Sequence, residues 1–195
     1  MATHEITFPI ADPEEILKLR AGDEVIVQGH IVGIRDRTQI RIFDQGMEPP
    51  MDLSGAFLLH TAPGVRKLAD GRYEKVCIGT TTSARMVRFT EGLGERYGVR
   101  AICGKGGFPD EAIEPMRAHG MVYFAIVGGA AALETTQIEE IEEVQWEELM
   151  PECLWKFRVK DFGPLTVGID AHGNSLYHDV QAAATKKLEE LYARL

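Results

Sequence analysis

The sequence predicts an α/β domain with a mixed sheet, and two observations carry this prediction. Short apolar segments at residues 76–79, 99–103 and 121–127 alternate with segments of helical periodicity at 84–97 and 109–119. Strands and helices that alternate at short intervals form βαβ units, in which parallel strands are joined by right-handed crossovers. The chain is also long enough to bury its own core, because 45% of its 195 residues are hydrophobic.

The first third of the chain predicts two helices and three strands, and each has a local signal. Alternating apolar residues mark an edge strand, an Asp-Pro pair marks a helix start, and glycines mark ends. The predicted elements are an edge strand through Ile6, Phe8 and Ile10, a helix from Asp12-Pro13 to Arg20, a strand over 25–32 that Gly33 ends, a helix over 35–43, and a short apolar strand over 56–59.

The two central helices are predicted from an apolar stripe and from glycine stops. In the helix over 84–97, the residues on one stripe are Met86, Phe89, Leu93 and Tyr97. Gly98 and Gly120 follow the helices over 84–97 and 109–119, and glycine is the usual residue just past a helix end. We therefore expect both helices to end at these glycines.

The last third of the chain gives a mixed pattern. Residues 138–146 fit a helix or a strand, and both alternatives stay open. The other expected elements are a short helix over 130–135, strands over 155–159 and 165–169 around a Phe162-Gly163-Pro164 turn, and an amphipathic helix over 177–195 with Val180, Ala184, Leu188, Leu191 and Leu195 on one face.

Charge and composition exclude several classes of protein. The net charge is −9 and the pI is about 5.2, which argues against a general nucleic-acid-binding or anionic-membrane surface. No apolar run approaches the roughly 18 residues of a membrane span, and the N-terminus lacks the basic and apolar regions of a secretory signal. We therefore expect residues 1–195 to form a single cytoplasmic domain that binds neither nucleic acid nor membrane.

The three cysteines do not predict a metal site. Cys77, Cys103 and Cys153 are widely spaced, and no pair has zinc-binding spacing. A sparse, odd number of cysteines is typical of a reducing compartment, and free cysteine behaves as a small buried apolar residue. We expect buried thiols and no metal bound by this chain alone.

One junction between a strand and a helix, Gly79 to Arg85, is unusually rich in hydroxyl groups. Thr80, Thr81, Thr82 and Ser83 crowd a helix N-terminus, which already favours anions. Arg85 lies in the first turn, where a cation opposes the helix dipole, so a bound carboxylate would explain it. The alternative is a hydroxyl-rich helix cap with an exposed arginine.

A second junction, Cys103 to Gly107, has the sequence Cys-Gly-Lys-Gly-Gly. Gly104 and Gly106 let the backbone approach a ligand, and Lys105 adds a point charge. A phosphate-binding P-loop does not fit, because the glycine spacing is one residue too long and Gly106 stands where Ser or Thr should be. The alternative is a flexible loop with a solvated lysine.

A third junction carries three arginines within seven residues, Arg35 to Arg41, directly after a predicted strand. Three cationic loops that follow strands predict a shared site for a small dicarboxylate, since arginine forks bind carboxylates with two hydrogen bonds. A solvated helix face is the alternative for this cluster. His60 ends an apolar strand and is either part of the same site or a satisfied boundary residue.

Together these motifs resemble one known family, the C-terminal (beta) domain of class I iron–sulfur fumarases and the beta subunit of L(+)-tartrate dehydratases. The resemblance covers most of the chain, and the matching segments occur in the family's order. They are Gly33-Ile34-Arg35-Asp36 with Arg41, residues 81–86 (Thr-Thr-Ser-Ala-Arg-Met), residues 103–107 (Cys-Gly-Lys-Gly-Gly), residues 126–132 (Ile-Val-Gly-Gly-Ala-Ala-Ala) and residues 154–164.

The resemblance implies a fold, a reaction and site residues. The fold is a swivelling β/β/α domain, and the reaction is reversible hydration of fumarate to L-malate or dehydration of L-tartrate. Arg35, Arg85 and Lys105 correspond to residues that bind substrate carboxylates, and Thr81 to a threonine implicated in proton transfer. A threonine hydroxyl is a weak base, so it needs activation from elsewhere.

The resemblance also implies a partner. The family's four-iron, four-sulfur cluster, which acts as a Lewis acid, is held by cysteines of an alpha part that this chain lacks. We therefore expect a beta subunit that is inactive alone and works in a hetero-oligomer, for instance two alpha and two beta chains.

Two positions depart from the family pattern. Gln39 stands at the histidine of the motif Arg-Asp-x-x-His-x-Arg, and Thr80 replaces a common proline. Gln39 forms hydrogen bonds but does not carry a proton, so the departure indicates altered substrate preference, compensation by His60 or reduced activity. A non-catalytic dicarboxylate-binding module remains the alternative from another functional class.

Overall fold

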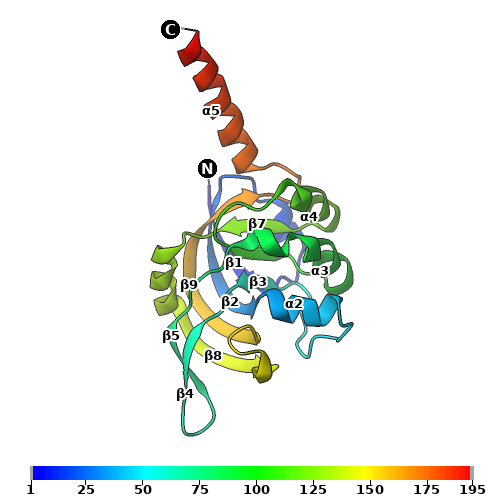
Figure 1. Ribbon diagram of the computed structural model, residues 1–195, viewed down its shortest axis with the longest axis vertical. Coiled ribbons are helices and arrows are strands. Elements are labelled where there is room, and N and C mark those ends of the chain that lie inside the picture. Colours follow the sequence, from blue (N-terminus) through cyan, green and yellow to red (C-terminus); the bar gives the residue numbers. More distant parts are fainter. Residues whose placement is uncertain (1, 194–195) are drawn as a thin grey trace.

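A seven-stranded mixed sheet organises the chain, and the predicted α/β fold is confirmed (Figure 1). The computed structural model describes residues 2–193. The strand order is β1-β2-β3-β6-β7-β9-β8, and β9 also pairs with β2. Because β9 pairs antiparallel with both β2 and β7, the sheet curls back on itself into a partial barrel. The parallel strands β1, β2, β3, β6 and β7 form the βαβ part.

The first third of the fold follows the prediction with small shifts. The bounds are β1 (Thr3–Phe8) at the sheet edge, α1 (Glu14–Leu17), β2 (Glu24–Ile34), α2 (Asp36–Phe43) and β3 (Phe57–His60). Gly33 lies inside β2 and does not end it, which corrects the prediction. A Cβ atom at Gly33 would come within 2.7 Å of the Phe157 ring, so glycine leaves room for this ring of the paired strand β9.

The prediction of a βαβ strand at 76–79 is wrong. Residues Gly64–Lys67 (β4) and Tyr73–Cys77 (β5) form a separate two-stranded hairpin, which projects from the body in Figure 1. Val76 is 59% exposed, and only Ile78 of the predicted segment is buried among apolar residues. The strand that precedes the threonine-rich segment in the main sheet is therefore β3.

The central helices and strands occur as expected, although the first helix is mixed in type. Its first half is a 3-10 helix and its second half an α-helix, and Gly98 and Gly120 both end helices in the left-handed conformation. The bounds are η1 (Ser83–Phe89), α3 (Thr90–Tyr97), β6 (Ala101–Gly104), η2 (Asp110–Ala112), α4 (Ile113–His119) and β7 (Val122–Ala125).

The last third settles one open alternative and corrects one prediction. Residues 138–146 are mostly strand, and a single long strand replaces the two strands predicted around Gly163. That strand bends without turning back, because Asp161 and Gly163 adopt positive φ angles and interrupt its regular pairing with β2. The bounds are η3 (Gly129–Gln137), β8 (Ile138–Gln145), η4 (Glu147–Leu149), β9 (Leu154–Ile169) and α5 (Leu176–Tyr192).

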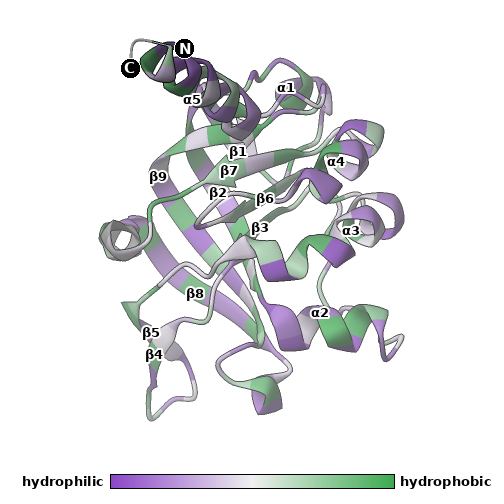
Figure 2. Ribbon diagram, turned by 45° about the horizontal axis from the view of Figure 1, so that its top comes forward, coloured by the Kyte–Doolittle hydropathy of each residue, from purple (hydrophilic) through white to green (hydrophobic). Residues whose placement is uncertain are grey.

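Two apolar cores fill the fold. One lies inside the partial barrel and includes Phe57, Phe124 and Trp155. The other lies between the sheet and helices α2, α3 and α4, and it buries Met86, Phe89 and Leu93 of the predicted stripe. Figure 2 shows these helices side by side along the sheet.

Helix α5 projects away from both cores, which the amphipathic pattern did not predict (Figure 1). None of its residues is buried, and Val180 and Leu188 are 61% and 50% exposed. Leu195 of the predicted stripe lies outside the described residues. No helix in the described part of the chain is long and apolar enough to cross a bilayer.

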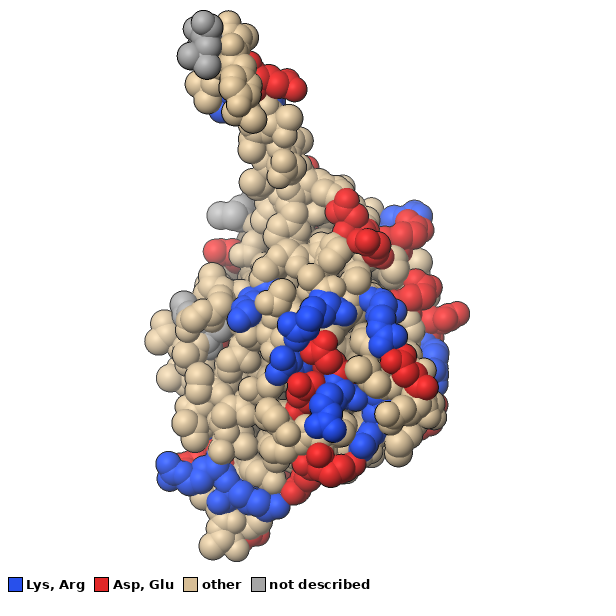
Figure 3. Space-filling view, in the orientation of Figure 1, with Lys and Arg blue, Asp and Glu red and all other residues tan. Residues whose placement is uncertain are grey.

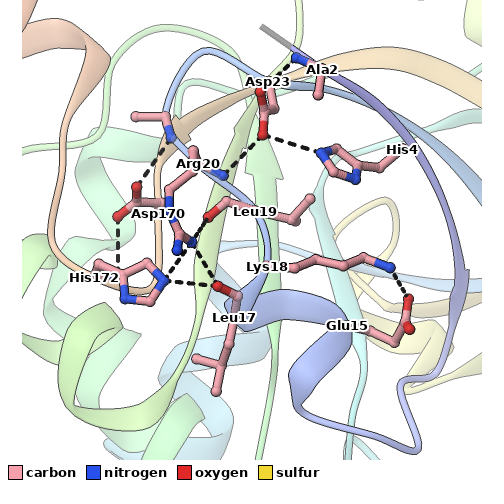
Figure 4. A network of polar contacts seen from close by, with 11 residues as sticks. Ala2, His4, Glu15, Leu17, Lys18, Leu19, Arg20, Asp23, Asp170 and His172 are labelled. Atoms are coloured by element: carbon pink, nitrogen blue, oxygen red, sulfur yellow. Dashed lines mark hydrogen bonds and ion pairs between the residues drawn. The ribbon is translucent and has the colours of Figure 1, made fainter.

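Two buried carboxylates hold the N-terminal end of the fold together (Figure 4). Asp23 accepts hydrogen bonds from the backbone N–H groups of Ala2 and Arg20 at 2.8 and 3.1 Å. Asp170 accepts from the N–H groups of Ala21, His172 and Asn174 at 2.9–3.1 Å. The loop before β2 and the loop after β9 are thereby fixed side by side.

We predict that Asp170→Asn destabilises the protein by about 1–3 kcal/mol, because an amide NH2 group replaces one buried carboxylate oxygen and cannot accept a hydrogen bond from the backbone. Burial alone raises the pKa of Asp170, but hydrogen bonds from Asn174, Ala21 and His172 outweigh burial and lower it. Since the folded-state pKa is depressed, the contribution is complete above about pH 4 and is lost as the pH falls further.

Urea unfolding at several pH values measures this effect. The control is Asp70→Asn in the exposed hairpin, which we expect to leave stability nearly unchanged. Equal stability of the two variants at pH 7 would contradict the role of Asp170.

Candidate functional site

The three junctions singled out in the sequence meet at the carboxyl ends of β2, β3 and β6. The Thr81 N–H donates to the carbonyl oxygen of His60 at 2.7 Å, and the Lys105 N–H donates to the carbonyl oxygen of Thr81 at 3.2 Å. The threonine-rich segment therefore lies between the ends of β3 and β6. In parallel α/β sheets this edge is where ligands bind.

Gly104 allows this close approach. A Cβ atom there would lie 2.0 Å from Ser83 Oγ and 3.0 Å from the Thr81 carbonyl oxygen, so no side chain fits. Gly106 has φ +76°, a conformation that favours glycine, and a Cβ atom there would make only an ordinary contact, 3.9 Å from Thr82 Cγ2. Both glycines named from the sequence thus shape the loop around Lys105.

Arg85 and Asp36 form a two-point ion pair at this edge. The distance from Arg85 Nη2 to Asp36 Oδ2 is 2.9 Å, and from Nε to Oδ1 it is 3.3 Å. The hydrogen bond from Arg85 holds the pKa of Asp36 below its usual value, although burial opposes the shift. Arg35 Nε also lies 3.4 Å from Asp36 Oδ2. One carboxylate therefore orients both predicted arginines.

A second carboxylate, Glu152, reaches the same cluster from the loop before β9. It accepts a hydrogen bond from the Arg37 N–H at 2.9 Å and lies 3.6 Å from Arg35 Nη1. Sequence reasoning missed Glu152, because nothing in its neighbourhood marks it. Asp36 belongs to one of the motifs that carry the family resemblance. Its position next to Arg35 was the only sequence signal that it lies at the site.

Of the three predicted cations, Lys105 has the charged group with the fewest contacts to the described residues. It is partly exposed, and its Nζ makes no hydrogen bond or ion pair with the residues that the structure describes. Figure 3 shows lysine and arginine side chains gathered near the centre of one face, with acidic side chains between them. This face is open and is separate from a cavity of about 410 Å³ lined by His30, Met51 and Lys156.

The other predicted site residues are buried. Thr81 is 9% exposed, His60 is 1% exposed, and His60 Nδ1 lies 2.9 Å from Ser83 Oγ. Burial lowers the pKa of His60 to about 3, so the imidazole is neutral at physiological pH. Gln39 is completely buried on α2, and its amide has no hydrogen-bond partner among the described residues.

The cysteines do not form the donor set of an iron–sulfur cluster. Cys77 is exposed in the hairpin, whereas Cys103 and Cys153 are buried. Burial raises the pKa of both buried thiols, which disfavours the thiolate that a metal needs. The described residues contain no group of three His, Cys, Asp or Glu side chains arranged to hold a metal ion.

Comparison with known proteins identifies the family. Residues 3–180 match the family model described as the fumarase C-terminus. The chain belongs to this family. It is 42% identical to the L(+)-tartrate dehydratase subunit beta of Escherichia coli K12 over 88% of this chain and 85% of that protein. The expected family membership is thus confirmed.

Two further relatives extend the comparison. A putative L(+)-tartrate dehydratase subunit beta from Methanocaldococcus jannaschii is 36% identical, over 96% of this chain and 98% of that protein. A putative class I fumarate hydratase from Geobacillus stearothermophilus is also 36% identical, over 93% of this chain but only 35% of that longer protein. The same domain therefore occurs both as a separate subunit and within a larger chain.

We predict that Gly104→Ala destabilises the protein by about 1–3 kcal/mol, because the new Cβ atom forces the Thr81 and Lys105 segments apart. The matched control is Gly79→Ala in the same region, where a Cβ atom has no neighbour within 4 Å. Urea unfolding of both variants measures the difference. If Gly104→Ala is as stable as Gly79→Ala, the close approach is not required.

Proposed function

We propose that this chain is the beta subunit of a hydro-lyase that interconverts fumarate and L-malate, at an active site shared with a separate alpha subunit. The observation that carries the proposal is the meeting of Arg35, Arg85, Lys105 and Thr81 at one sheet edge. Family membership adds the reaction class, because relatives carry the names tartrate dehydratase and fumarate hydratase.

The cations suit a small dicarboxylate. The Arg85 guanidinium already holds one carboxylate, Asp36, through two of its nitrogen atoms, so its geometry suits a substrate carboxylate as well. Lys105 supplies a separate positive charge for the far carboxylate. Fixing both ends of the substrate places the carbon between them beside Thr81, and such positioning lowers the barrier to reaction.

Thr81 is the proposed proton-transfer residue. Its backbone lies between the ends of β3 and β6, and among the described residues its hydroxyl has no hydrogen bond to a basic side chain. An unassisted hydroxyl is a poor base. We infer that the alpha subunit supplies the activating group, and that the isolated beta chain is inactive.

The cofactor also belongs to the proposal. The cysteines of this chain do not fit a cluster, so we assign the four-iron, four-sulfur cluster to the alpha subunit. The expected assembly is a cytoplasmic hetero-oligomer, with two alpha and two beta chains as the simplest form.

L-Tartrate is the second candidate substrate, and the 42% identical subunit carries that name. A non-catalytic dicarboxylate-binding module is the alternative from another class. Anaerobic reconstitution with the alpha subunit, followed by fumarate hydration and L-tartrate dehydration assays, distinguishes them. Turnover of neither substrate, combined with tight dicarboxylate binding by the isolated chain, would favour the binding module.

We predict that Arg85→Ala and Lys105→Ala each lower kcat/KM of the reconstituted enzyme by about 30- to 1,000-fold. This corresponds to the loss of roughly 2–4 kcal/mol of transition-state stabilisation, as for an oxyanion-hole donor. The control is Arg88→Ala, which removes an exposed arginine of the same 3-10 helix that pairs with Asp44. Wild-type kcat/KM in both site variants would overturn the site assignment.

A further inference from the structure

A buried chain of three polar side chains lies beneath the candidate site. His60, Ser83 and Tyr123 are each no more than 1% exposed. His60 Nδ1 lies 2.9 Å from Ser83 Oγ, and Ser83 Oγ lies 3.1 Å from the Tyr123 hydroxyl oxygen. Polar groups are costly to bury unless they are hydrogen-bonded, so three of them in contact indicate a specific arrangement.

Tyr123, at one end of this series of polar side chains, contacts the backbone on both sides of Lys105. The Tyr123 hydroxyl lies 2.9 Å from the Gly104 carbonyl oxygen and 3.0 Å from the Gly106 carbonyl oxygen. The Tyr123 ring is itself held by Phe108, which stacks on it with ring centroids 4.7 Å apart. Tyr123 therefore fixes the loop that carries Lys105.

Ser83, in the middle of the series, belongs to the threonine-rich segment. Ser83 lies between Thr81 and Arg85 in the sequence, and its N–H donates to the Lys105 carbonyl oxygen at 3.3 Å. Because a Cβ atom at Gly104 would lie only 2.0 Å from Ser83 Oγ, the two segments have no room to come closer. The contacts among His60, Ser83 and Tyr123 thus set the separation between the segments that carry Arg85 and Lys105.

Proton counting assigns the donors. A carbonyl oxygen only accepts, so the contacts of the Tyr123 hydroxyl with Gly104 and Gly106 are hydrogen bonds only when the single Tyr123 proton points to one of these oxygens. The Ser83 hydroxyl then donates to the Tyr123 oxygen, and His60 donates to Ser83 from Nδ1. This order satisfies the Tyr123, Ser83 and His60 Nδ1 groups together. It leaves the His60 proton on Nδ1, so that Nε2, which has no hydrogen-bond partner among the described residues, carries none.

The surroundings of His60 favour the neutral ring. Burial is the main cause of its low pKa, and the charged groups that act on it are Asp36, which raises the pKa, and Arg85, which lowers it. The ring also contacts Phe108 edge-on, with centroids 6.4 Å apart. Because the neighbouring ring is apolar and the two charges act in opposite directions, the surroundings do not stabilise a protonated His60 ring.

We propose that His60, Ser83 and Tyr123 are positioning residues, which hold the Thr81–Arg85 segment and the Lys105 loop at a fixed separation through a neutral His60 protonated at Nδ1. The inference rests on the proposed function only in taking these two segments as the substrate-binding ones. None of the three residues needs to contact the substrate.

The protonation state is tested by nitrogen-15 NMR of the full chain labelled at histidine. We expect the His60 ring to remain neutral from pH 5 to 8, with the proton on Nδ1. A His60 signal that titrates near the usual histidine pKa of about 6.5, or one with the proton on Nε2, would overturn the assignment.

The positioning role is tested with Tyr123→Phe, which removes only the hydroxyl, and with Tyr97→Phe as the matched control. Tyr97 lies on α3, outside the site, and its hydroxyl donates a hydrogen bond to Glu48 in the loop after α2. We expect the amide signals of Lys105 and Gly106 to shift in Tyr123→Phe and to stay in place in Tyr97→Phe. Ser83→Ala should give the same shifts if Tyr123→Phe does not fold.

Kinetics of the reconstituted complex add a readout that a purely structural role would not move. Tyr123→Phe should raise KM for the dicarboxylate about tenfold and change kcat much less, because Lys105 binds a carboxylate before and during the reaction. Unmoved amide signals in a folded variant would overturn the inference. A wild-type complex that turns over neither substrate would overturn only the proposed function, since the NMR results still decide the positioning role.

Discussion

The close approach of the threonine-rich segment to the end of β6 is the constraint on which the rest of the site depends. Thr81 pairs through its backbone with His60 on one side and Lys105 on the other, and Gly104 lacks the side chain that would prevent it. A sheet edge with this spacing brings together His60, Thr81 and Lys105, which lie 21 and 24 positions apart in sequence. The cations therefore meet because of backbone packing, and their mutual repulsion is offset by carboxylates from α2 and from the loop before β9.

Arg35 and Arg85 are ion-paired within the protein, whereas Lys105 has no ion pair among the described residues. Arg35 and Arg85 share Asp36, so under the proposed function a substrate carboxylate competes with a carboxylate of the protein for the arginine forks. Such competition favours ligands with two carboxylates, because the second one gains the interaction with Lys105. On a chain of net charge −9, lysine and arginine side chains still gather on one face, with acidic side chains between them (Figure 3). Exposed ion pairs of this kind add little to stability, so orientation is their main effect.

Sequence patterns predicted the parts of this fold that are governed by local signals. Gly98 and Gly120 end helices as expected, and the stripe through Met86, Phe89 and Leu93 is buried. The errors lie where long-range pairing decides. Residues 73–77 pair with β4 in a separate hairpin, and β9 bends at Asp161 and Gly163, where its pairing with β2 changes register. Arg35, Arg85 and Lys105 were predicted from their positions after strands and from the family resemblance, and Thr81 from the resemblance; as site residues they stay predictions. Glu152 and Tyr123 were missed, because only the folded chain brings them to the site.

The most direct test of the central claim is a crystal structure of the alpha–beta complex with bound L-malate or L-tartrate, measuring the distances from the ligand carboxylates to this chain. The account predicts that one carboxylate lies within about 2.7–3.2 Å of the guanidinium nitrogens of Arg35 or Arg85 and the other at a similar distance from Lys105 Nζ. The Thr81 hydroxyl should then be the nearest hydroxyl of this chain to the carbon that loses its proton. A dicarboxylate bound in the complex away from Arg85 and Lys105 would contradict the account.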